Sequence, residues 1–315
     1  MTNVMLRSPA RIEHPEAMKI RSTILVVMVL LSPLFHPTNA AEPKKILVVT
    51  TTTGFRHTSI PTSEKVLEQL GKDSGEFTVD FVRQPPEPAG RRPGNNATPE
   101  ERKAYDDAQE KFKEAMTNEL KKLSPENLKK YDGVAFVSTT GELPIPDPQG
   151  LLDWIKAVHA FIGIHAASDT FHRWPAYIEM LGGEFDHHGP QLSVDCLNED
   201  PQHPATAPLP KVWTISQEEI YQFKNYDPAK VHDLLILDKR PQMPQTPGHF
   251  PVSWCKTYGI GRVFYTSLGH REDVWDADPN LRDRKNDQDT SKTFQKHVLG
   301  GIEWALKLKE GGKAD

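Results

Sequence analysis

The first half of the chain alternates between short apolar runs and longer segments with apolar residues at helical spacing. Four runs are rich in β-branched or aromatic residues, which is typical of buried strands. They cover residues 45–52, 77–82, 133–138 and 161–164. Apolar stripes, with Pro or Thr near the starts, predict three helices. These cover residues 61–71, 99–122 and 151–158.

The second half adds short strand-like segments and then an amphipathic closing helix over residues 290–308. The strand-like segments cover residues 191–197, 211–216, 234–237, 252–256 and 262–267. Strands that alternate with helices form a parallel sheet covered on both faces. We therefore predict an α/β fold with a mostly parallel central sheet, helices on both faces, and a single domain over residues 45–308.

The N-terminal segment has the layout of a secretory signal peptide. A basic start is followed by an apolar run at residues 24–31 and a small-residue site that ends at Ala40. We expect residues 1–40 to be removed and the protein to be exported, either to the periplasm or to the medium. Met18 is an alternative start, and an uncleaved amphipathic anchor is the competing interpretation. A short leader and a C-terminal tail complete the chain, at residues 41–44 and 309–315.

Composition narrows the partners of the protein. The net charge of −5 gives no electrostatic basis for binding nucleic acid. After cleavage of the signal peptide we expect no membrane contact. The sequence is compatible with either a monomer or a homo-oligomer. Cys196 and Cys255 are too few for a disulfide framework, so two free thiols are favoured over a pair.

Ligands of open parallel sheets bind beyond the carboxyl ends of the strands. That rule selects the loops at residues 50–59, 138–142 and 163–170, which carry Arg56, His57, Thr140, His165 and Asp169. His57 is a candidate ligand or catalytic group, and Thr140 a candidate substrate contact. Arg56 would hold a carboxylate or a sugar oxygen, or face solvent.

His165 has two interpretations. As a functional group it would be a general base, a substrate donor or a metal ligand; otherwise it caps the backbone. Asp169 lies four residues further on, where it would orient His165 or favour the positive end of a helix. His270 follows the strand at 262–268, and it joins the other two histidines if that strand runs parallel to the core sheet.

Two further pairs carry titratable groups. His187 and His188 are adjacent, so on a strand they face opposite ways. Glu218 and Glu219 are also adjacent, and we expect Glu219 to point inward and Glu218 to be solvated. Several imidazoles and a carboxylate would suit Zn²⁺ or a related divalent metal. That hypothesis assigns as ligands His57, His188, His270 and Glu219. The same groups would otherwise perform acid–base chemistry directly.

Six motifs, taken in order, resemble the ThuA-like (trehalose utilisation) family. They are GFRH at 54–57, STTG at 138–141, GIHAASDT at 163–170, GGEFDHH at 182–188, EEIY at 218–221 and GRVFYTSLGH at 261–270. The resemblance implies a fold related to class I glutamine amidotransferases and flavodoxin-like proteins, and a link to sugar metabolism. It also favours His188 over its neighbour. His165 stands where the amidotransferase relatives carry a nucleophilic Cys, so a Cys-based amidotransferase is excluded.

Aromatic residues near these motifs are candidates for stacking on a sugar. Trp174 and Tyr221 are taken as substrate contacts, whereas Tyr177 is assigned to the core. The sequence therefore favours an exported carbohydrate-active enzyme that uses His-based, metal-assisted or metal-free chemistry on a small or oxidised sugar. The alternative is a non-catalytic sugar-binding or interaction module on the same scaffold.

Overall fold

The computed structural model describes residues 42–88 and 92–311. The predicted signal peptide lies outside these residues. Within them, no helix combines the length and the apolar character that crossing a membrane requires.

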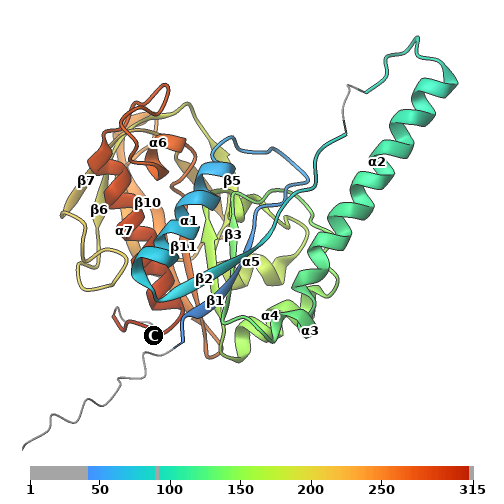
Figure 1. Cartoon of the computed structure of the whole chain (residues 1–315). Coiled ribbons are helices and arrows are strands. Elements are labelled where there is room, and N and C mark those ends of the chain that lie inside the picture. Colours follow the sequence, from blue (N-terminus) through green and yellow to red (C-terminus); the bar gives the residue numbers. More distant parts are fainter. Residues whose placement is uncertain (1–41, 89–91, 312–315) are drawn as a thin grey trace, which may run out of the picture. The chain divides into compact units, whose positions relative to one another are not determined.

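A nine-stranded sheet forms the centre of the described chain, in the order β2-β1-β3-β4-β11-β10-β9-β6-β7 (Figure 1). The first five of these strands are parallel: β2 (Phe77–Val82), β1 (Lys44–Val49), β3 (Gly133–Val137), β4 (Ala160–Ile164) and β11 (Gly261–Thr266). The other four pair antiparallel: β10 (Met243–Tyr258), β9 (His232–Arg240), β6 (Leu192–Asn198) and β7 (Val212–Glu218). The predicted α/β sheet is confirmed, with an antiparallel extension on one side.

Helices cover both faces of the parallel part. Ile46 and Val48 of β1 point into one apolar cluster, together with α1 (Ile60–Ser74) and α7 (Gln288–Ala305). Leu47 and Val49 point into the other, because side chains alternate along a strand. That second cluster includes residues of α2 (Pro99–Leu120), α4 (Pro148–Ala157) and α5 (Pro175–Leu181).

Short elements complete the fold. They are the 3₁₀ helices η1 (Lys121–Leu123) and η2 (His165–Asp169), the helices α3 (Pro125–Leu128) and α6 (Glu272–Trp275), and a two-stranded antiparallel sheet of β5 (Glu184–His188) and β8 (Tyr221–Lys224). The sequence pattern did not reveal β5 and β8 because both are short and largely polar. Their pairing places His188 opposite Tyr221.

The direction of β11 decides where His270 lies. Tyr265 pairs with Gly163 and Thr266 with Ile164 in parallel register. The ends of β11 and β4 therefore lie at the same edge of the sheet, so His270 follows β11 where His165 follows β4.

Candidate functional site

Four titratable side chains converge at the carboxyl edge of the parallel strands. His57 lies in the loop after β1, His165 directly follows β4, His270 lies shortly after β11, and Glu219 directly follows β7. One ligand atom from each lies within 4.8 Å of the others. We call this set the His/Glu cluster. Three of its members are buried and His270 is half-buried.

The backbone and the hydrogen bonds of His165 fix its orientation and its tautomer. Its φ of 53° lies in the left-handed region that non-glycine residues rarely adopt, as expected for a sharp strand-to-helix turn. Its Nδ1 lies 2.7 Å from the carbonyl oxygen of Ser267. Because a carbonyl only accepts, Nδ1 carries the proton and Nε2 presents its lone pair to the cluster.

The lone pair of His165 faces two neighbours. Nε2 lies 3.1 Å from His57 Nε2 and 3.1 Å from the hydroxyl of Tyr221. Burial, followed by the charge of His57, lowers the pKa of His165 well below its usual value. Burial, followed by the charge of His270, lowers the pKa of His57 to about 4. Both imidazoles are therefore neutral at pH 7.

His270 behaves differently because a carboxylate faces it. Its Nδ1 lies 3.2 Å from Glu219 Oε1. Burial opposes protonation of His270, but the negative charges of Glu219 and Glu218 outweigh it and raise the pKa. Nδ1 of His57 is buried without a hydrogen-bond partner in the described part of the chain, whereas Nδ1 of His270 has the Glu219 carboxylate beside it.

The spacing of the cluster suits a metal ion. Tetrahedral coordination with bonds of about 2.1 Å places neighbouring ligand atoms about 3.4 Å apart. The contacts of His165 with His57, of His270 with Glu219, and of His165 with Glu219 measure 3.1, 3.2 and 3.9 Å. The His/Glu cluster could therefore hold a metal ion.

Glu218 corrects one prediction from the sequence. It is fully buried rather than solvated. Its Oε1 accepts the backbone N–H groups of Glu219 at 2.8 Å and of His270 at 3.2 Å, so one carboxylate holds two members of the cluster. Oε2 has no partner among the described residues. Burial raises the pKa of Glu218 to about 7.

His188 and Tyr221 lie beside the cluster. Nδ1 of His188 is 3.1 Å from Oε2 of the buried Glu219, and the His188 side chain is itself about 42% exposed. Its neighbour His187 pairs with Asp186 instead, and successive side chains of a strand point to opposite faces. His188 is therefore the histidine of the pair that approaches the site, at its rim.

Two predicted substrate contacts serve the loops instead. Thr140 is buried, donates its hydroxyl to Phe55 O at 2.9 Å and accepts the N–H of Gly54 at 3.2 Å. Arg56 donates to Thr50 O at 2.9 Å and to Gln84 Oε1 at 3.1 Å. Their hydrogen bonds thus hold the loop that carries His57, and neither contacts the His/Glu cluster.

Trp174 and Asp169 also lie outside the cluster. Trp174 stacks on Tyr177, with ring centroids 5.7 Å apart. Asp169 Oδ1 lies 2.7 Å from Nε2 of His172, not against His165 as proposed from the sequence. Nδ1 of His172 lies 2.7 Å from Glu184 Oε1. Hydrogen bonds to both carboxylates outweigh burial and raise the pKa of His172.

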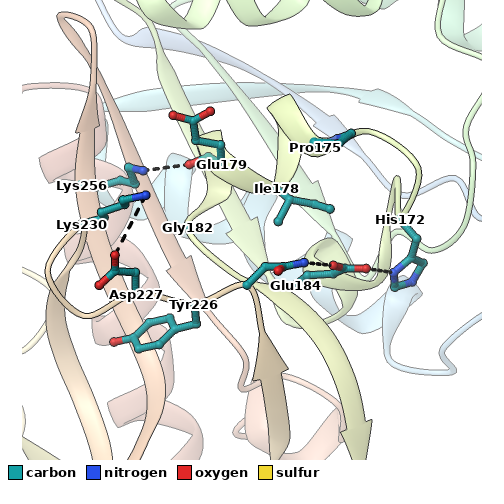
Figure 2. Close-up of a pocket in the computed structure, with 11 residues that line it drawn as sticks. His172, Pro175, Ile178, Glu179, Gly182, Glu184, Tyr226, Asp227, Lys230 and Lys256 are labelled. Carbon is teal, nitrogen blue, oxygen red and sulfur yellow. Dashed lines mark hydrogen bonds and ion pairs between the residues drawn. The ribbon is translucent and has the colours of Figure 1, made fainter.

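A separate cavity of about 640 Å³ is lined in part by His172 and Glu184. Figure 2 shows Glu184 hydrogen-bonded to His172 at one end of the cavity, with Asp227, Lys230 and Lys256 at the other. Sequence reasoning did not single out His172 and Glu184, because their pairing joins a loop to β5 and no local spacing reveals it. The residues that line the cavity do not include the members of the His/Glu cluster.

The mostly parallel sheet with helices on both faces and the strand-to-helix turn at His165 define an α/β protein whose fold is consistent with the amidotransferase-like type. A family model described as "ThuA: Trehalose utilisation" matches residues 45–305, and the chain belongs to this family. No curated protein matches the sequence.

Two solved structures share the fold. A putative ThuA-like protein from Parabacteroides merdae is 20% identical, with a TM-score of 0.57 over 86% of this chain and 92% of that one. A putative ThuA-like protein from Bacteroides uniformis is 18% identical, with a TM-score of 0.53 over 86% of this chain and 95% of that one. At these identities the likeness concerns the fold alone.

Proposed function

We propose that the protein is an exported carbohydrate-active enzyme whose His/Glu cluster binds one divalent ion such as Zn²⁺. The observation that carries this proposal is the convergence of three imidazoles and the Glu219 carboxylate within 4.8 Å. Imidazole nitrogens and a carboxylate oxygen are the usual ligands of zinc, but catalytic sites have three protein ligands and an open fourth position. With all four side chains bound, water or substrate would therefore occupy a fifth position. The membership in a trehalose-utilisation family supports a sugar as the substrate.

Two of the three imidazoles are in the protonation state that metal binding requires, whereas the raised pKa of His270 means that a bound ion would have to displace its proton. His57 and His165 are neutral at pH 7 because burial lowers their pKa values, and neutral imidazole is the form that ligates metals. The carbonyl of Ser267 fixes the tautomer of His165 and aims its lone pair inward.

A bound divalent ion would polarise a sugar carbonyl or hydroxyl, or lower the pKa of a bound water. His188 and Tyr221 lie at the edge of the cluster, where they would exchange protons with a bound small or oxidised sugar. Export rests on the signal-like N-terminus, and sequencing the N-terminus of the mature protein tests cleavage after Ala40.

Metal content and turnover test the proposal together. Elemental analysis of the purified protein should find about one equivalent of a divalent metal, which His165→Ala and Glu219→Gln remove along with turnover on a sugar panel. His187→Ala is the matched control, because that histidine pairs with Asp186 away from the cluster. Metal and turnover that survive both cluster variants would contradict the proposal. Sugar binding without turnover would favour the non-catalytic module.

A further inference from the structure

Phe55 is an apolar side chain left in solvent at the edge of the candidate site. It is 66% exposed, and of the large hydrophobic residues described as exposed it alone is aromatic. It lies two residues before His57, and the two rings meet edge to face with centroids 4.9 Å apart. An exposed phenylalanine gains little of the free energy that burial of its ring would provide.

The loop around Phe55 holds the ring in this position. The carbonyl of Phe55 accepts the hydroxyl of Thr140 at 2.9 Å, and Thr53 N donates to Thr140 O at 2.9 Å. Gly141 packs so closely against this loop that a Cβ there would clash with Thr53 Oγ1. Two segments at the ends of β1 and β3 are therefore clamped together, and the exposure of Phe55 is a property of the folded loop.

We infer that Phe55 is a platform on which the apolar face of a sugar ring stacks, placing the sugar's polar groups over the His/Glu cluster. This inference rests on the proposed function and assigns its substrate class to a pyranose. One face of such a ring carries mainly C–H groups, and covering it with an aromatic ring removes apolar surface of both partners from water.

The contact between Phe55 and His57 sets the geometry of this subsite. The edge-to-face packing leaves the ring of Phe55 uncovered by any other described aromatic side chain, while His57 continues inward to His165. A sugar on the platform therefore has one edge toward solvent and another toward the imidazoles. Phe55 binds substrate in this account, and the cluster carries the chemistry.

Sugar binding by Phe55 variants tests the inference without any need for turnover. Saturation-transfer NMR and titration calorimetry would use three probes: trehalose, methyl α-D-glucoside and glucuronate. Phe55→Ala should weaken binding of each bound probe about tenfold, because covering one face realises roughly half of the burial free energy of a phenylalanine. Phe55→Trp should keep the affinity, and Phe55→Leu, apolar but not flat, should fall between them.

The chain provides a matched control. Ile260 is 67% exposed and precedes β11, at the end of that strand opposite to His270. Ile260→Ala should leave sugar affinity unchanged, and metal content should stay the same in all these variants.

Wild-type affinity in Phe55→Ala would overturn the inference and leave the proposed function intact. Binding that depends on Phe55 in a protein free of metal would support the inference and overturn the metal site. No binding of any probe to the wild type would overturn the sugar substrate, and the platform with it.

Discussion

Which atoms of the cluster are free to bind a ligand depends on the hydrogen bonds that its residues already make. Ser267 occupies Nδ1 of His165, Glu218 occupies the backbone N–H groups of Glu219 and His270, and Nε2 of His165 is left for the cluster. The side chains therefore point inward because backbone groups behind them are held. Loss of a group that orients the ligands typically costs about 10–100-fold in metal affinity or activity.

Glu218 gives a direct test of this arrangement. Glu218→Ala removes the acceptor of two backbone N–H groups and should weaken metal affinity about 10–100-fold, measured by competition with a chelator. Glu218→Gln keeps an acceptor oxygen and should stay within a few-fold of wild type. Equal affinity in both variants, with the fold intact by circular dichroism, would show that Glu218 does not position the ligands.

At the residue scale, part of the candidate site could be predicted from the sequence. The rule that ligands bind beyond the ends of parallel strands identified His57 and His165, and it identified His270 once β11 was parallel. It could not show that Glu218 is buried, because burial depends on how the end of β7 meets the segment after β11. The roles proposed for Thr140 and Arg56 depended on side-chain direction, which hydrogen bonds across loops decide.

At the scale of elements, boundaries were predicted where an apolar run or a helix-capping residue marks them. The boundaries of β2 and the start of α2 agree with the sequence analysis, and Thr98 caps α2 together with Glu101. Only Met116 and Leu120 of α2 are buried, so that helix is secured mainly at its end. β5 and β8 were missed because four- and five-residue polar strands carry no readable alternation.

The same small sheet explains how the site acquires its rim. Pairing of β5 with β8 sets His188 opposite Tyr221, and both lie beside Glu219 or His165. The parallel strands thus supply the base of the site and the added sheet supplies its border. That division is invisible in the sequence, since the two strands are separated by β6 and β7.

At the scale of the whole molecule, buried histidines couple stability to pH. His297 of α7 is fully buried, donates from Nδ1 to the carbonyl of Ala205 at 2.9 Å, and has its pKa lowered by burial to about 4. In the unfolded chain its pKa is about 6.5. Between these values the unfolded chain binds the proton more readily, so the free energy of unfolding falls as pH drops from about 6.5 to 4.

We predict that His297 contributes about 3 kcal/mol to this fall. Urea denaturation at a series of pH values, compared between wild type and His297→Gln, isolates the contribution. Buried Glu218 acts in the opposite direction, because its raised pKa makes the folded state hold the proton more tightly, but it is common to both proteins. Parallel pH curves for the two proteins would refute the assignment.

Anomalous diffraction from crystals grown with Zn²⁺ shows directly whether the His/Glu cluster binds the ion. A single peak at the zinc edge should lie within about 2.0–2.2 Å of one nitrogen each of His57, His165 and His270 and of a Glu219 oxygen. A peak confined to another place, such as Glu184 and His172, or no peak above background in the His/Glu cluster, would contradict the account.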